Sequence, residues 1–333
     1  MKKETQQIRE AAAVGPAVVA DIGGTNARFG LWNDGRVQHV HRYLCADFDS
    51  VAAVYATYLR DIEIAAPRRA ALAIATPVTA DIVRMTNCPW EFSIEGLQRA
   101  LGLDDLKVVN DLAALAHAVP YLAASSVESV GTLREPKAGR SFAVIGAGTG
   151  LGVASAVHDG NEWRVHASEG GHSSFAPTSE IEDVVLRHAN NVWAHVSYER
   201  LACGEGISVI HRALGAHRDH EPAEIVCLAE QGNGHAIESL RTYSRILGNF
   251  AGNVALMFAA TMGVYLGGGV LGKLRHSFDA DAFREGFVGK GRFTAWLNEI
   301  PTLRILAAYP ELDGLGHLLE TSGLRGSTRT SAP

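Results

Sequence analysis

Two segments of the sequence place a glycine-rich turn between two apolar extended stretches, and this arrangement limits the folds open to the chain. In the first, the turn DIGGTN at Asp21–Asn26 joins Ala17–Ile22 to Ala27–Trp32. In the second, GAGTGLG at Gly146–Gly152 follows Ser141–Gly146 and precedes another such stretch. The N–H groups of such turns can surround phosphate oxygens. Two of them favour an α/β phosphate-binding protein, although each alone is also typical of an ordinary hairpin.

Neither turn matches the common nucleotide-binding motifs. No GxxxxGK[ST] sequence occurs, and a strand rather than a helix is expected after each turn, which excludes the P-loop and the dinucleotide-binding turn. A literal GxGxxG occurs at Gly267, Gly269 and Gly272, but the later residues Gly289–Arg292 offer no acid for a ribose. We expect these late glycines to let a base and a ribose lie against the backbone.

Length and charge narrow the class of protein further. The chain has 333 residues, a formal net charge of −6 and 47% hydrophobic residues, which predicts two domains with sizeable cores and no nucleic-acid partner. Its four cysteines form no CxxC pair, so we expect reduced thiols and a cytoplasmic protein. Residues 250–272 carry no charge, but Asn253 and several glycines there favour a buried helix and strand over a membrane span.

The pattern along the chain predicts two mixed α/β domains behind a flexible tail at residues 1–16. The smaller domain spans 17–122, opens with three antiparallel strands and is completed by 313–333, and the larger spans 123–312. The longest expected helix runs from about His235 to Met262. The residues on its apolar stripe are Ile237, Leu240, Leu247, Phe250, Val254 and Met257.

The pair Asn110–Asp111 follows an expected strand and precedes a helical stretch. Aspartate is a favoured N-cap, so Asp111 could simply begin the helix. In a cleft, the same carboxylate could accept a proton from a substrate hydroxyl as a general base, while Asn110 holds a neighbouring hydroxyl. The sequence leaves both interpretations open.

The segment EGGH at Glu169–His172 places a carboxylate and an imidazole on one glycine turn. These groups suit hydrogen bonds to sugar hydroxyls better than metal binding, because the glycines disfavour the helix that an ExxH metal motif needs. Glu199 follows Ser197 at another expected helix start, where an acid also stabilises the helix dipole. No GxSxG occurs, so a nucleophile-elbow hydrolase has no support.

A series of short motifs extends over residues 17–318. In order they are DIGGTNARFGLW, MTN, WEFS, NDLAALAHAVP, GAGTGLGVA, EGGHSSFAP, ERLACGEG and LGGGV. This series resembles bacterial glucokinases of the ATP-dependent, zinc-free type. The resemblance implies the actin-like (ribonuclease H-like) ATPase fold, two α/β domains around a central cleft, and a homodimer. It also implies transfer of the γ-phosphoryl of ATP to the 6-hydroxyl of D-glucose, the first step of glycolysis, with Mg²⁺.

The resemblance implies a role for each matching residue. Asp111 would be the base that faces the sugar 6-hydroxyl, and Asp21 would face the hydration shell of Mg²⁺. The other implied sugar contacts are Asn110, Gly150, Glu169, His172 and Glu199. The implied ATP contacts are Gly23, Gly24, Thr25, Asn26, Gly148, Thr149, Gly267, Gly268 and Gly269.

The chain departs from the family pattern at three places, including the atypical segment after Leu318, and the first of the two motif changes below concerns the sugar more than the reaction. GEG at Gly204–Gly206 stands where the family usually has GPG, and TAD at Thr79–Asp81 stands where it has TGD. A kinase for mannose, fructose or an amino sugar is an alternative, because residues that contact hydroxyls do not separate these sugars, and a non-catalytic sugar-sensing regulator on the same fold is another. The cysteine-rich zinc motif of the related ROK kinases is missing.

Overall fold

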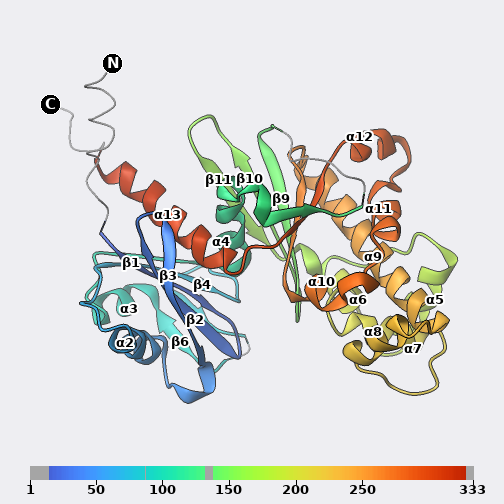
Figure 1. Cartoon of the computed structure of the whole chain (residues 1–333), viewed down its shortest axis with the longest axis horizontal. Coiled ribbons are helices and arrows are strands. Elements are labelled where there is room, and N and C mark those ends of the chain that lie inside the picture. Colours follow the sequence, from blue (N-terminus) through green and yellow to red (C-terminus); the bar gives the residue numbers. More distant parts are fainter. Residues whose placement is uncertain (1–14, 87, 132–137, 328–333) are drawn as a thin grey trace. The chain divides into compact units, whose positions relative to one another are not determined.

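The computed structural model describes residues 15–86, 88–131 and 138–327, with only the backbone at 275 and 322–327. The chain forms two compact units: unit 1 is Met1–Pro120 with Ala308–Pro333, and unit 2 is Tyr121–Ala307. Each unit is built on one large sheet with helices packed on it (Figure 1). Residues 1–14 of the expected tail lie outside the described part.

Unit 1 contains a five-stranded sheet in the order β3-β2-β1-β4-β7. Its strands are β1 (Ala17–Ile22), β2 (Asn26–Asn33), β3 (Arg36–Leu44), β4 (Arg69–Ile74) and β7 (Asp105–Asn110), and a separate ribbon consists of β5 (Ile82–Arg84) and β6 (Glu91–Ser93). Its helices are α2 (Val51–Asp61), α3 (Ile94–Ala100), α4 (Asp111–Ala118) and α13 (Pro310–Ser327). The first three strands are antiparallel, as predicted, whereas β1, β4 and β7 run parallel.

Alternation of side chains along β1 gives the unit 1 sheet two buried faces. Val18, Ala20 and Ile22 belong to a core cluster that includes residues of α2, whereas Ala17 and Val19 belong to a second cluster that includes residues of α13. The second face is rich in alanine, and α13 itself carries Gly314 where it meets α4 and Gly316 where it meets Trp32 of β2. These small residues let the helices approach closely.

Unit 2 contains a six-stranded sheet in the order β11-β10-β9-β12-β13-β8. Its strands are β8 (Val127–Ser129), β9 (Ser141–Ala147), β10 (Leu151–His158), β11 (Trp163–Ser168), β12 (Val264–Gly267) and β13 (Thr302–Ile305). Its helices are α5 (Glu180–Ala189), α6 (Tyr198–Ala202), α7 (Gly206–Ala213), α8 (Pro222–Glu230), α9 (Gly234–Phe258), α10 (Gly269–Leu274), α11 (Ala280–Val288) and α12 (Thr294–Asn298). As in unit 1, the first hairpin strand, β9, pairs antiparallel with β10 and parallel with β12.

Helix α9 passes through the core of unit 2, but it is shorter than predicted. It ends at Phe258, because Ala259 adopts a left-handed conformation with φ of 46°. The apolar stripe is buried in its middle turns, whereas its end members Ile237 and Met257 are 47% and 67% exposed. The core therefore covers only the central part of the stripe. Within the described ranges, no helix combines the length and apolar character needed to cross a membrane.

Candidate active site

The first glycine turn follows the end of β1 in unit 1. Gly23 N–H donates to the carbonyl of Asn26 at 2.9 Å, which closes the turn between β1 and β2. Asp21, just before it, has a side chain that is 15% exposed and accepts a hydrogen bond from Arg28 at 2.9 Å. Burial raises the pKa of Asp21, and the Arg28 guanidinium only partly offsets that effect. The turn therefore begins at a poorly solvated carboxylate.

Asn110 and Asp111 lie where β7 passes into α4. Asn110 is the N-cap, since its Oδ1 accepts from Leu112 N–H at 2.9 Å, so Asp111 is the first residue of the helix rather than its cap. Burial raises the pKa of Asp111 to about 6; the Leu112 N–H acts in the opposite direction, and the charge of Asp21 raises the pKa further. A carboxyl group with this pKa is ionised at neutral pH and still basic enough to accept a proton.

A third carboxyl group, Glu311, joins these two from the first turn of α13. Burial raises the pKa of Glu311 to about 7, and the charges of Asp21 and Asp111 raise it further, whereas Arg28 acts in the opposite direction. No motif indicates this residue, because Glu311 lies in a segment remote from both aspartates in the sequence. It is a functional candidate that our sequence reasoning missed.

The packing of α13 on α4 explains how Glu311 reaches the site. A Cβ on Gly314 would lie 1.9 Å from the carbonyl oxygen of Ala114, so the two backbones touch there and only glycine fits. Three residues before this contact in each helix, Glu311 of α13 interacts electrostatically with Asp111 of α4. Three residues after it, His317 of α13 interacts with His117 of α4. The two helices therefore run in the same direction and bring their first turns together.

In unit 2, the structure brings together three of the implied sugar contacts: Gly150, His172 and Glu199. One carboxylate oxygen of Glu199 accepts from Leu151 N–H at 3.0 Å, and the other lies 3.7 Å from His172 Nε2. A Cβ on Gly150 would lie 2.7 Å from Glu199 Oε2, so the glycine leaves room for that carboxylate. Glu199 itself lies in the first turn of α6 (Tyr198–Ala202), which Ser197 caps.

Glu169 lies on the same short turn as His172, and its side chain is exposed. The turn is a 3₁₀ helix, Gly170–His172, in which His172 N–H donates to the Glu169 carbonyl at 3.0 Å. Gly171 allows this path, because a Cβ there would lie 1.8 Å from the carbonyl oxygen of Leu151. The two glycines of EGGH therefore hold the turn against β10, while Glu169 and His172 remain accessible to a ligand.

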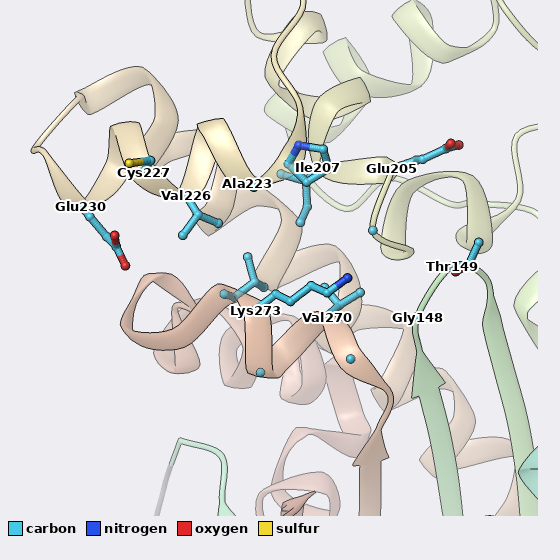
Figure 2. Close-up of a pocket in the computed structure, with 15 residues that line it drawn as sticks. Gly148, Thr149, Glu205, Ile207, Ala223, Val226, Cys227, Glu230, Val270 and Lys273 are labelled. Atoms are coloured by element: carbon cyan, nitrogen blue, oxygen red, sulfur yellow. The ribbon is translucent and has the colours of Figure 1, made fainter. Parts of the chain in front are cut away.

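A pocket of about 750 Å³ opens beside the second glycine turn, entirely within unit 2 (Figure 2). Gly148 and Thr149 of the turn line it, together with the start of α7, most of α10 and one side of α8. Its apolar lining comes from Ile207, Pro222, Ala223, Val226, Val270 and Leu274, and its ionisable lining from Glu205, Cys227, Glu230 and Lys273. A volume of this size suits a nucleoside with its phosphates.

The late glycines differ in their relation to this pocket. Gly269 lines it, whereas Gly267 and Gly268 are not among its lining residues. Gly268 has a φ of +88°, and a Cβ there would lie 2.2 Å from the carbonyl oxygen of Ala147. Gly268 is thus needed for the close packing of β12 on β9, and its place beside the pocket is indirect.

A comparison with protein-family models identifies the family. The glucokinase model matches residues 18–322. The chain belongs to the glucokinase family. Among solved structures, a glucokinase from an Antarctic psychrotroph is similar over 92% of this chain and 99% of its own, with 32% identity and a TM-score of 0.83. The fold is therefore the mixed α/β, actin-like ATPase fold of sugar kinases.

Curated relatives agree with this assignment to the glucokinase family. The glucokinase of Chromobacterium violaceum is 40% identical over 313 residues, which cover 92% of this chain and 90% of the relative. The bifunctional protein glk of Paraburkholderia xenovorans is 46% identical over 316 residues, but the match covers only 49% of that protein. The chain thus spans about half the length of the bifunctional relatives it matches.

A metal in a glucokinase-family site need not be held by protein ligands alone. Within the described residues, no group of three or more histidine, cysteine, aspartate or glutamate side chains could hold a metal ion. Mg²⁺ usually keeps several waters and is bound through one or two carboxylates plus substrate phosphates. Asp21 fits that chemistry. Arg28 donates to its Oδ2, which leaves Oδ1 for a water of the hydrated ion, and the carboxylate directly precedes the glycine turn.

Proposed function

We propose that this chain is a glucokinase that transfers the γ-phosphoryl group of ATP to the 6-hydroxyl of D-glucose. The observation that carries the proposal is the half-buried Asp111 carboxyl group, whose pKa is raised to about 6 directly after a sheet strand in a chain of the glucokinase family. A glucokinase needs a base of this kind beside the attacking hydroxyl. Phosphoryl transfer otherwise requires mainly alignment and neutralisation of charge.

In this proposal, Asp111 accepts the proton of the 6-hydroxyl, and Asn110 holds a neighbouring hydroxyl. Glu199, His172, Glu169 and the backbone at Gly150 bind the remaining hydroxyls. Carboxylates and imidazoles offer the acceptors and donors that vicinal hydroxyls require. A site that hydrogen-bonds a hydroxyl rejects a sugar that lacks this hydroxyl more strongly than an apolar contact would, so these residues also favour one hexose over another.

ATP is assigned to the two glycine turns and the unit 2 pocket. The N–H groups of the turns would bind phosphate oxygens, through Gly23, Gly24, Thr25 and Asn26 in unit 1 and through Gly148 and Thr149 in unit 2. Gly269 would contact the nucleoside, with Gly267 and Gly268 supporting it. Asp21 would hold hydrated Mg²⁺, which when bound neutralises phosphate charge. A ROK-family glucokinase from Streptomyces griseus, which shares the fold, has been solved in complex with glucose and AMPPNP.

Assembly and location are further parts of the proposal. The resemblance to bacterial glucokinases supports a cytoplasmic homodimer. Light scattering on the purified chain measures its mass in solution directly. A monomer at all micromolar concentrations would contradict the homodimer without affecting the proposed reaction.

The test is a coupled assay of the purified chain with ATP and Mg²⁺ against glucose, mannose, fructose and glucosamine. We expect the highest kcat/KM with glucose. Asp111→Asn should lower kcat by about 10² to 10⁴-fold, the usual contribution of a general base. Its melting temperature at neutral pH should be unchanged or higher, because burial of the charged carboxylate is removed.

Asp104→Asn is the matched control, since Asp104 is an exposed carboxylate whose partner is Arg68. It should retain the activity of the wild type. Near-native kcat in Asp111→Asn would overturn the assignment of the base. Sugar binding without turnover of any hexose would instead favour the sugar-sensing regulator.

A further inference from the structure

The unit 2 pocket has two distinct ends. Thr149 and Glu205 lie at one end, and Glu230 lies at the other (Figure 2). Thr149 and Glu205 also line a second cavity of about 50 Å³ together with Glu199. The Thr149 end is therefore the end nearer to a proposed sugar contact.

This polarity orients a nucleotide in the pocket, and the step rests on the proposed function. The phosphoryl group that is transferred must come close to the sugar, so the phosphate chain lies at the Thr149 end. The nucleoside then lies farther along the pocket, where Ala223 and Val226 supply apolar contacts. Apolar walls with few polar groups are typical of a site for a purine base.

The charges that line the pocket do not suit a phosphate chain without a cation. Glu205 and Glu230 both line it, and Lys273 is the only lysine or arginine among the lining residues. Like charges repel, so both carboxylates oppose a phosphate chain; Arg200 shares the second cavity with Glu205 but does not line this pocket. A nucleoside diphosphate or triphosphate therefore depends on Lys273 for charge compensation within this pocket.

The placement of Lys273 fits that requirement. It projects from α10, and its amine points along the pocket toward the end at which Gly148 and Thr149 lie, away from Glu230 (Figure 2). The side chain is exposed, and none of the ion pairs found among the described residues includes it. An ammonium group on a long flexible side chain commonly binds phosphate as a point charge.

We propose that Lys273 binds the phosphate chain of the nucleotide and thereby positions the phosphoryl donor, with Glu205 opposing it. Lys273 contributes to affinity for nucleoside polyphosphates rather than for the nucleoside itself. The usual proline of the GPG segment carries no charge, so Glu205 weakens donor binding in this chain. The balance of these two charges sets the KM for ATP.

Calorimetric titration of the full chain with ADP and with adenosine tests this inference. In Lys273→Met we expect about tenfold weaker ADP binding and less than a twofold change for adenosine, because only the charged group is removed. Lys273→Arg should bind ADP within about threefold of the wild type. Glu205→Gln should bind ADP about threefold more tightly. The affinity of Lys273→Met for ADP should also depend less on salt concentration.

Arg241→Met is the control, since Arg241 is an exposed cation of α9 outside the pocket. It removes the same charge from unit 2 and should leave ADP binding unchanged. In turnover assays, Lys273→Met should raise the KM for ATP and leave the KM for glucose unaltered. An equal loss of ADP and adenosine affinity would overturn the inference, because it would indicate a disturbed pocket.

The two proposals fail in distinguishable ways. A wild-type chain that neither binds ADP nor phosphorylates glucose would overturn the proposed function. A wild-type chain that does both, with Lys273→Met binding ADP as tightly as the wild type, would overturn only the role of Lys273.

Discussion

The two glycine turns have the same architectural setting but different surroundings. In each unit, the strand before the turn pairs antiparallel with the strand after it and parallel with a later strand. Around the unit 1 turn, burial raises the pKa values of Asp21, Asp111 and Glu311. Beside the unit 2 turn lies a pocket of about 750 Å³ with apolar walls. The arrangement in unit 1 thus brings ionisable carboxyl groups together, and the same arrangement in unit 2 borders a pocket.

This difference shows how one strand arrangement supports two tasks. In unit 1, α4 and α13 pack closely over the alanine-rich face of the sheet and bring carboxyl groups together with little water. In unit 2, the start of α7, one side of α8 and most of α10 line the pocket and leave space between them. The turn has backbone N–H groups in both units, while the helices packed nearby determine whether carboxyl groups or an open pocket surround it.

If unit 1 supplies the base, acid should inactivate the enzyme through Asp111. Burial raises the pKa of Asp111 to about 6, so its protonated fraction rises below that pH and proton acceptance is lost. We expect kcat/KM for glucose to fall about tenfold per pH unit below about 6, and up to about 100-fold by pH 4. Initial rates in buffers of constant ionic strength, with circular dichroism at each pH, measure this. A flat profile from a folded protein would contradict it.

The contact of α13 with α4 can be broken by one methyl group. In Gly314→Ala the new Cβ would lie 1.9 Å from the Ala114 carbonyl oxygen, so the helices must separate. We expect a loss of about 2–3 kcal/mol in the free energy of unfolding, measured by denaturant titration. Gly234→Ala, which meets no atom within 4 Å in α9, should be neutral or slightly stabilising. Equal stabilities of the two variants would show that the contact is not close.

Replacing Glu311 with glutamine should remove a loss of stability that the wild type shows as the pH rises. Burial raises the pKa of Glu311 from 4.5 to about 7, so wild-type stability is lost between these pH values as the buried group ionises. Relative to the wild type, Glu311→Gln should gain about 2 kcal/mol over this range and little above pH 7. Glu95→Gln, at an exposed carboxylate, should show no such trend. Parallel stability curves for Glu311→Gln and the wild type would contradict the burial of this charge.

The role of the unit 2 turn in sugar binding can be tested at Gly150. In Gly150→Ala the Cβ would lie 2.7 Å from Glu199 Oε2, and the flexible carboxylate must move away from Leu151 N–H. Loss of one charged hydrogen bond predicts about a tenfold higher KM for glucose with little change in stability. Gly234→Ala again serves as the control. An unchanged KM would remove Glu199 from the sugar contacts.

Local features of the fold could be predicted from the sequence. The strands around both turns and the transition at Asn110 into α4 follow from apolar alternation and from side chains that bond to nearby backbone groups. The N-cap of α4 is Asn110, whereas the sequence suggests Asp111 as a possible cap; a local pattern does not separate two such adjacent residues. Helix α9 ended early because the left-handed conformation of Ala259 depends on its tertiary surroundings.

The rest of the candidate site depends on contacts between distant segments. Glu311 reaches Asp111 only because Gly314 fits against Ala114, and no short motif encodes that register. The pocket likewise depends on how α7, α8 and α10 come together, so the sequence could not distinguish Gly269 from Gly267 and Gly268 as a lining residue. Local sequence preferences thus predict the helices and strands, whereas tertiary packing determines which of them come into contact.

Because α13 covers the alanine-rich face of the unit 1 sheet, a ribosome must translate all of unit 2 before that face can be buried. Until then, Ala17 and Val19 of β1 and Ala71 of β4 would lack their α13 partners. Unit 2, in contrast, forms its core from one continuous segment of the chain. Domains generally fold as units during synthesis. The unit 2 pocket can thus form while the carboxyl groups of Asp21 and Asp111 still lack Glu311, and the three carboxyl groups come together only when α13 has been synthesised.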